Sequence, residues 1–345
     1  MSLNPLKFSI LICTKNGSEK LHRTIVAISN LEASEYFDYE LIIVDNNSED
    51  NTLQHANRLC RQYLHTRNWQ VFSETKSGKQ NALMAATKKA SGSWLIICDD
   101  DNSLSSSYLH EAQSLIKRIS GVGIFGGLSY LPQEYYNLPN WFEKFKRSFA
   151  IGKFWFAPEE EGETHALWGA GMVVRREIYD FLIQNNLTML NGRKNYTLYV
   201  GGEDTELCVI AKLLGYKVYF SSRLMLDHYF DVSRLTWQNF KHDFVRNNLA
   251  ELYISLYELL SFEELSHNQF ISYFRKLKNK LLLNMLPNLF KKSISYLFHN
   301  GVGYSFDLEL SNQIAQLREM KYIRKDSVKY IKYLNKLNKL LYKPS

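Results

Sequence analysis

The sequence lacks the features that would place it in several common classes of protein. Its four cysteines form no C-x-x-C pair and have no metal-ligand spacing. No apolar run approaches the roughly 20 residues that span a bilayer, and the apolar residues near the start are expected to form a strand, not a signal peptide. No internal repeat or low-complexity segment is present. These absences predict a cytoplasmic protein with reduced cysteines and no membrane-spanning helix.

Acidic residues are scarce toward the C-terminus. From Leu265 to Ser345 there are 15 Lys and Arg but only 4 Asp and Glu, and none of these acids lies between Leu265 and Phe306. The whole chain has a formal net charge of +7, so the part before Leu265 is mildly acidic. This asymmetry predicts two regions with different roles, which we place at residues 1–232 and 233–345.

The front of the chain alternates between two patterns. Of its 345 residues, 45% are hydrophobic and 22% are charged, which is ordinary for a folded globular protein. Apolar, β-prone runs predict strands at 8–13, 41–44, 69–72 and 94–98, and helical patterns cover 18–31, 52–63 and a segment opening near Gly78. Repeated strand, turn and helix predict an α/β fold with a Rossmann-like, mostly parallel sheet flanked by helices, followed by a helical C-terminal region.

Three of these predicted strands run directly into polar residues. The polar segments are Thr14–Asn16, Asp45–Asn47 and Asp99–Asp101. Ligands of open α/β sheets bind beyond the carboxyl ends of the strands. We therefore expect the three segments to converge on a binding site.

The run Asp99-Asp100-Asp101 is the strongest chemical signal. Carboxylates two residues apart in an extended turn can point to the same side and hold one hard divalent cation, which prefers oxygen ligands. A helix N-cap or a solvated acidic turn is the structural alternative. A cap needs only one acid, however, and three adjacent acids repel each other, so the sequence favours a metal site.

A second acidic pair, Glu203-Asp204, follows Gly201-Gly202 and opens an amphipathic helical pattern. The helix dipole favours acids in the first turn, so capping alone also explains this pair. The glycines allow a ligand to approach the backbone closely. A carboxylate fixed at the start of a helix would also suit a general base.

These segments together resemble the inverting family 2 glycosyltransferases, which have the nucleotide-diphospho-sugar transferase (GT-A) fold. The matching segments occur in the order Phe8–Asn16, Ile42–Ser48, Asp99–Asp101 and Gly202–Asp204. No single motif decides the resemblance, but four in register are hard to obtain by chance. The similarity implies a nucleotide diphosphate sugar as donor, with UDP-sugars favoured, and Mn²⁺ or Mg²⁺ as cofactor.

The resemblance also implies roles for matching residues. Asp101 would be the principal metal ligand, and His228 would complete the coordination, although a lone histidine near strands is often structural. Asp204 would be the general base, and Glu203 would position the acceptor. The residues expected to contact the nucleotide sugar are Thr14, Asn16, Asp45, Lys79, Asp99, Asp100, Trp168 and Gly169.

Two of these expected contacts have structural alternatives. Lys79 would face the diphosphate from a helix N-terminus, but it also suits a solvent-exposed position. Trp168 lies in Trp168-Gly169-Ala170-Gly171, where an indole can stack on a sugar ring and small residues let the sugar approach. The alternative is a tryptophan buried on a strand.

The predicted reaction transfers a sugar to a hydroxyl of a saccharide or lipid-linked acceptor, in bacterial surface polysaccharide or glycolipid synthesis. A nucleotidyltransferase of similar fold is one alternative, although Cys13–Gly17 lacks its glycine-rich, basic signature. A non-catalytic sugar-nucleotide-binding scaffold is another, which the acids at both key positions argue against. The G-x-G-x-x-G match at Gly121–Gly126 follows a helical pattern and opens none, so we expect no dinucleotide site there.

The basic tail is predicted to be helical, with a helix over 270–298 broken at Pro287. Basic amphipathic helices bind anionic membranes, so we expect peripheral association with the inner face of the cell membrane. A helical subdomain with a solvated basic face is the alternative. No nucleic-acid motif accompanies the basic residues, so nucleic acid is not an expected partner.

Overall fold

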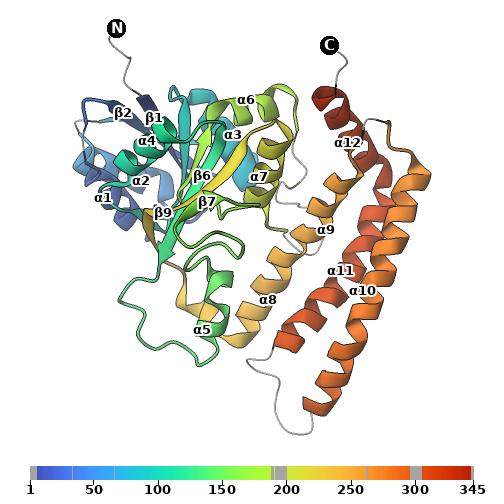
Figure 1. The fold of residues 1–345 in the computed structure, drawn as a ribbon. Coiled ribbons are helices and arrows are strands. Elements are labelled where there is room, and N and C mark those ends of the chain that lie inside the picture. The colour runs from blue at the N-terminus through green and yellow to red at the C-terminus, as the bar shows by residue number, and fades with distance from the viewer. Residues whose placement is uncertain are drawn as a thin grey trace. The chain divides into compact units, whose positions relative to one another are not determined.

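The computed structural model describes residues 6–32, 34–65, 67–187, 190, 200–261, 263–295 and 305–342 (Figure 1). The chain forms two compact units. The sheet unit comprises Met1–Asn137, Phe145–Gly192 and Glu203–Phe230, and the helical unit comprises Leu138–Lys144, Arg193–Gly202 and Asp231–Ser345. The expected division between residues 232 and 233 into a catalytic and a helical region stays a prediction.

Within the described residues, nine strands of the sheet unit form one mixed sheet. They are β1 (Leu6–Thr14), β2 (Phe37–Asp45), β3 (Asn68–Ser73), β4 (Trp94–Asp99), β5 (Asn102–Leu104), β6 (Val122–Tyr130), β7 (Glu161–Glu163), β8 (Met172–Arg175) and β9 (Lys217–His228). Their order is β3-β2-β1-β4-β8-β6-β9-β5, with β7 paired to β9. The first four strands in this order run parallel, as predicted, whereas β8 is antiparallel to both β4 and β6.

Helices cover both faces of this sheet (Figure 1). They are α1 (Leu21–Ser29), α2 (Thr52–Tyr63), α3 (Lys79–Lys89), α4 (Tyr108–Arg118), α6 (Arg176–Gln184) and α7 (Glu203–Leu213), with a 3₁₀ turn η1 (Lys146–Phe149). The apolar side chains of α1, α2 and α4 bury one side of β1, β2 and β4 in a common core that includes Ile10, Ile12 and Ile25. α3 packs on β1 and β2. This arrangement confirms the predicted fold class.

Two short segments refine the predicted elements of the sheet unit. The residues after the acidic run form the short strand β5, so α4 begins only at Tyr108. In the glycine-rich run at Gly121–Gly126, every residue after Gly121 belongs to strand β6, and no helix directly follows the run. A place within a strand agrees with the expectation that this run is not a dinucleotide-binding turn.

The helical unit contains α8 (Trp237–Asn248), α9 (Ala250–Ile254), α10 (His267–Ser295), α11 (Ser305–Lys325) and α12 (Ser327–Leu341), with 3₁₀ turns η2 (Val232–Leu235) and η3 (Ser255–Leu259). It also contains the short helix α5 (Phe142–Phe145), except for its last residue, Phe145. α10 packs against α11 and α12, and α11 also packs against α8. The Lys241–Asp307 ion pair (2.7 Å) joins α8 to α11. No helix among the described residues is long and apolar enough to cross a membrane.

The predicted break at Pro287 is wrong, because α10 continues through it. A proline inside a helix loses one hydrogen bond to the carbonyl four residues earlier, here that of Leu283. Both Pro287 and Leu283 lie on the exposed side of the helix. Water can therefore hydrate the freed carbonyl, and packing of the opposite side holds the helix together.

Candidate active site

The carboxyl end of β1 brings Thr14 to the acidic run. The buried Thr14 hydroxyl donates to Asp100 Oδ2 at 2.6 Å, and a Cβ at Gly17 would collide with both of these side chains. Asn16 has a φ of 51°, a left-handed conformation that asparagine tolerates, and its N–H donates to Ser48 Oγ at 2.8 Å. Thr14 and Asn16 thus lie beside the ends of β4 and β2. Sequence reasoning missed Gly17, although a glycine in a polar turn was a visible signal.

The carboxyl end of β2 carries a buried acid and a buried amide. Asp45 accepts from the N–H of Ser48 at 3.2 Å and from the hydroxyl of Ser73 at 3.3 Å. Asn46 Oδ1 accepts from the Gly78 N–H at 2.7 Å, which holds the turn that precedes α3. Sequence reasoning did not single out Asn46, because nothing local distinguishes it from the neighbouring Asn47.

The three aspartates at the end of β4 take different partners. Asp99 forms an ion pair with Lys79 Nζ, and Asp101 Oδ1 lies 3.3 Å from Asn102 Nδ2. Burial and then the charge of Asp101 raise the pKa of Asp100 to about 6. Burial also acts to raise the pKa of Asp99, but the Lys79 ammonium outweighs it and leaves that pKa lowered. Asp99 therefore bonds to α3 while Asp101 lies toward β9.

Strand pairing places His228 beside Asp101. β5 is antiparallel to β9, with Asn102 opposite His228. The His228 Nδ1 atom lies 2.9 Å from the carbonyl oxygen of Phe149. Because a carbonyl can only accept, Nδ1 carries the proton in the neutral ring and Nε2 is an acceptor. This Nε2 atom is 3.7 Å from Asp101 Oδ1.

Asp101 and His228 could hold a cation that also binds water and substrate oxygens. Among the described residues, no group of three or more His, Cys, Asp or Glu side chains is arranged to hold a metal. A closed structural site would require such a group. Mg²⁺ and Mn²⁺ sites that act on phosphates need fewer protein ligands, because waters and substrate oxygens complete the shell. Asp101 and His228 supply ligands of this kind.

The helix α7 begins with the predicted catalytic acids. It starts at Glu203, directly after Gly202, whose φ of 93° favours glycine. The Asp204 carboxylate accepts from the N–H of Gly169 at 2.9 Å and from the N–H of Thr205 at 2.7 Å. Burial raises the pKa of Asp204, and these two donors offset that effect only in part. Asp204 is thus a fixed carboxylate with an increased affinity for a proton.

Gly169 lies between Asp204 and Lys79. A Cβ built on this glycine would be 3.8 Å from Asp204 Oδ2 and 4.0 Å from Lys79 Nζ. Lys79 in turn bonds to Asp99. The start of α3, the end of β4 and the start of α7 therefore meet around one glycine backbone.

Aromatic rings adjoin this cluster at Trp168. Its half-buried indole lies edge-on to Phe154, with ring centroids 5.8 Å apart, and to Trp155 at 5.9 Å. Trp155 is 46% exposed. Trp168 precedes β8 and is not buried on a strand. Sequence reasoning missed Trp155, although the run Phe154-Trp155-Phe156 was an available signal.

Comparisons with known proteins agree with this architecture. The sequence profile of glycosyl transferase family 2 matches residues 9–183, just over half of the chain. S. aureus TarS 1–349 in complex with UDP-GlcNAc is similar at a TM-score of 0.50 and 15% identity, covering 97% of this chain and 91% of that one. The mannosyltransferase PcManGT from Pyrobaculum calidifontis, in complex with GDP-Man and Mn²⁺, is similar at a TM-score of 0.50 and 16% identity, covering 99% of this chain and 89% of that one.

A longer S. aureus TarS chain matches over 70% of this chain but only 38% of its own length, at a TM-score of 0.46 and 16% identity. This chain therefore spans less than half of that relative. At such low identities the solved structures establish the fold, and the family follows from the sequence profile. The chain is a glycosyltransferase with the GT-A fold and belongs to glycosyl transferase family 2.

Proposed function

We propose that this glycosyltransferase moves a sugar from a nucleotide diphosphate donor to an acceptor hydroxyl, with inversion at the anomeric carbon. The observation that carries the proposal is the position of Asp204, fixed by the N–H groups of Gly169 and Thr205 and close to the Lys79–Asp99 pair. The similar structures named above hold UDP-GlcNAc and GDP-Man. A UDP-sugar is the favoured donor here.

The proposed donor site follows the carboxyl ends of the strands. Thr14, Asn16 and Asp45 hold the base and ribose, and Asp99 and Asp100 lie near the ribose. Lys79 faces the diphosphate, and its ammonium group gives up part of its contact with Asp99 when the diphosphate binds. Trp168, supported by Trp155, offers an aromatic face to a sugar ring, and Gly169 lets that sugar approach the backbone.

Asp101 and His228 hold Mn²⁺ or Mg²⁺ in this proposal. The closeness of His228 Nε2 to Asp101 Oδ1, 3.7 Å, supports the assignment. When bound, the cation neutralises diphosphate charge and makes the nucleoside diphosphate a better leaving group. The hydrogen bond from His228 Nδ1–H to the Phe149 carbonyl fixes the ring so that Nε2, on the side of Asp101, would be available to a bound cation.

The proton of the acceptor hydroxyl passes to Asp204. A carboxylate with a raised pKa is a better base than an exposed aspartate. As the hydroxyl oxygen attacks, the bond to the diphosphate breaks on the opposite face, so a single displacement inverts the configuration. Glu203, the preceding residue, orients the acceptor. We expect a saccharide or lipid-linked acceptor, in bacterial surface polysaccharide or glycolipid synthesis on the cytoplasmic side.

A thermal-shift panel tests the donor and metal assignments. Wild-type protein is heated with UDP, GDP, dTDP, CDP or ADP, each with and without Mn²⁺ or Mg²⁺. A ligand at 100 times its dissociation constant stabilises a fold by about 2.7 kcal/mol. We expect stabilisation by one nucleotide, UDP, that requires metal and is lost in Asp101→Asn but kept in the exposed control Asp38→Asn.

Other outcomes would contradict the proposal. Stabilisation by a nucleoside triphosphate, added to the panel as a further ligand, with none by the diphosphates would favour a nucleotidyltransferase. Metal-dependent stabilisation that survives in both Asp101→Asn and His228→Gln would refute the metal site. The absence of any shift would favour a scaffold that does not bind sugar nucleotides.

A further inference from the structure

The C-terminal half of α10 exposes a row of large apolar side chains. Each is between 42% and 69% exposed, and the row, called the apolar stripe, consists of Leu282, Leu283, Leu286, Leu289 and Phe290. Spacings of three, four and seven residues place them on one side of the helix. Phe270 and Phe274 are buried on the other side. A contiguous apolar surface of this kind marks an interaction site.

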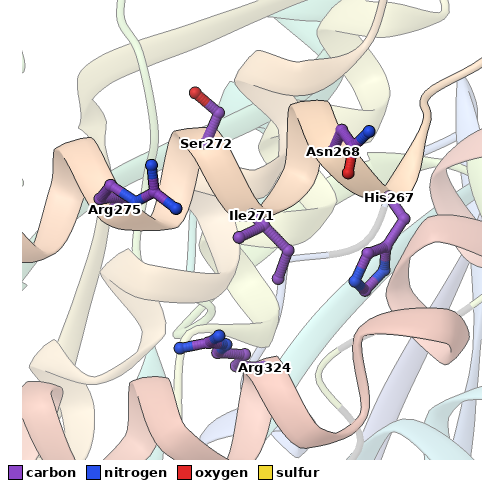
Figure 2. Close-up of a pocket in the computed structure, with 6 residues that line it drawn as sticks. All are labelled: His267, Asn268, Ile271, Ser272, Arg275 and Arg324. Carbon is purple, nitrogen blue, oxygen red and sulfur yellow. The ribbon is translucent and has the colours of Figure 1, made fainter.

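The same side of α10 continues toward its N-terminus as a cationic pocket. The pocket has a volume of about 430 Å³ and is lined by His267, Asn268, Ile271, Ser272 and Arg275 of α10 and by Arg324 of α11 (Figure 2). Arg275 is seven residues, or about two turns, before Leu282 and so lies in the same row as the stripe. Figure 2 shows that Arg275, Ile271 and His267 of α10 lie opposite Arg324.

The charges around the pocket are of one sign. No acidic side chain lines it, and among the described residues neither Arg275 nor Arg324 takes part in an ion pair. Two guanidinium groups at one pocket are suited to bind a phosphate, because each presents several N–H donors in a plane. The pocket is therefore suited to bind a phosphate group.

Lysines extend this charge along the helix. Lys276, Lys278 and Lys280 are exposed between the pocket and the stripe, and Lys291 is exposed just after the stripe. The sequence has no acid from Leu265 to Phe306 that would neutralise them. An apolar row that is bordered by cations and free of acids is complementary to a surface with an apolar interior and anionic groups on its outside.

We infer that this side of α10 docks on an anionic phospholipid bilayer. The apolar stripe enters the interfacial region of the lipid, and Arg275 and Arg324 hold a lipid phosphate, while the lysines lie among the headgroups. The stripe covers residues 282–290, too short to cross a bilayer. A second copy of α10 is a poorer occupant, because its own lysines and arginines would face these. This docking uses none of the residues of the proposed sugar transfer.

Co-sedimentation with vesicles tests the docking surface on the full chain. Vesicles contain phosphatidylcholine alone or phosphatidylcholine with phosphatidylglycerol. We expect binding only to the anionic vesicles, weakened by added salt. The triple variant Leu283→Gln, Leu286→Gln and Phe290→Gln removes the outer part of the stripe. It should reduce the binding constant about tenfold or more, whereas Val328→Gln, at an exposed position of α12, should not.

A second pair of variants separates the pocket from general charge. Arg275→Gln with Arg324→Gln should weaken binding to anionic vesicles more than Lys329→Gln with Lys332→Gln, which removes the same charge from exposed positions of α12. Thermal unfolding of each variant checks that it folds, and Leu283→Gln alone replaces the triple variant if that one does not.

Three results would overturn the inference. The first is absence of binding to anionic vesicles, and the second is equal binding by the stripe variant. The third is a wild-type dimer in sedimentation analysis that the stripe variant converts to a monomer with no loss of vesicle binding. That last result would assign the stripe to a second copy of the chain.

Discussion

Two carboxylates of the sheet unit, Glu40 and Asp204, have opposite electrostatic situations. Glu40, on β2, is buried, and its Oε1 accepts from the Ser9 hydroxyl at 2.7 Å and from the Ser91 hydroxyl and N–H at 2.6 Å. Burial acts to raise its pKa, but these donors outweigh it and the pKa is lowered. For Asp204 the effect of burial exceeds that of its hydrogen-bond donors, and the pKa is raised.

The difference separates a structural acid from the one that we propose as the base. Glu40 joins β1, β2 and the segment before β4, and its charge is stabilised by the hydroxyl groups of Ser9 and Ser91 and by the Ser91 N–H. Burial raises the pKa of Asp204 by more than its two N–H donors and the Lys79 charge lower it, and the charge of Asp99 adds to the rise. A base must hold a proton during reaction, so an acid that is stabilised less completely suits that role.

The largest expected effect is on catalysis at Asp204. Asp204→Asn should lower kcat by about 10²–10⁴-fold, because the amide cannot take the acceptor proton, while donor binding is retained. The melting temperature should change little, since the loss of the buried charge is offset by the amide nitrogen, which cannot accept from the second of the two N–H groups. Product formation and unfolding are measured side by side, with Asp38→Asn as control. Activity equal to wild type would remove Asp204 from the mechanism.

Glu40 should show the reverse pattern. Glu40→Ala leaves buried donors on Ser9 and Ser91 without their acceptor, which costs about 1–3 kcal/mol. The unfolding free energy should fall by that amount, and kcat at a temperature where the variant is folded should stay near wild type. Chemical denaturation measures the loss, with the exposed Glu19→Ala as the matched control. Equal stability of the two variants would show that the hydroxyl network does not stabilise the sheet.

The two acids should also give opposite pH dependences of stability. The lowered pKa of Glu40 contributes stability that is present above its unfolded value of 4.5 and lost as the pH falls through the folded value. The advantage of wild type over Glu40→Gln should therefore shrink in acid. The raised pKa of Asp204 has the opposite effect, because it lowers the stability of wild type as the pH rises above 3.8. The stability of Asp204→Asn relative to wild type should therefore increase over that range. Melting temperatures across this range check both signs.

The smallest structural effect is expected at Gly169. A Cβ there would be 3.4 Å from Asp204 Cβ, an ordinary contact, so Gly169→Ala should fold with an unchanged melting temperature. It should nevertheless reduce kcat/KM by roughly tenfold, about 1.4 kcal/mol, because the methyl group occupies space proposed for the donor sugar. Steady-state kinetics measure the change. An unchanged kcat/KM would show that the sugar does not approach this backbone.

The parallel part of the sheet could be predicted because its determinants are local. β1, β2 and β4 are apolar runs buried on both faces, and each ends at the polar residue where the run stops. The antiparallel β8 between β4 and β6 could not be predicted, since β8 is short and its neighbours are distant in sequence. The same holds for Asn46, whose bond to Gly78 spans 32 residues.

The candidate site, like the sheet, could be predicted in part from the sequence. The acidic run and the Glu203-Asp204 pair were visible as charges after apolar or glycine residues, and the structure brings Asp99, Lys79 and Asp204 around Gly169. Which aspartate bonds to which partner depends on three-dimensional packing and could not be read from the run itself. The helix through Pro287 was mispredicted because the exposure of its freed carbonyl depends on tertiary packing.

The most direct test is the proton affinity of Asp204 itself. Carbon-13 NMR of protein labelled at the aspartate carboxyl carbons, in the presence of a metal chelator, follows each carboxyl through a pH titration. The signal that is missing from Asp204→Asn identifies the residue. The account predicts a midpoint clearly above 3.8 for this signal. A midpoint at or below 3.8 would contradict the assignment of Asp204 as an acid held ready to accept a proton.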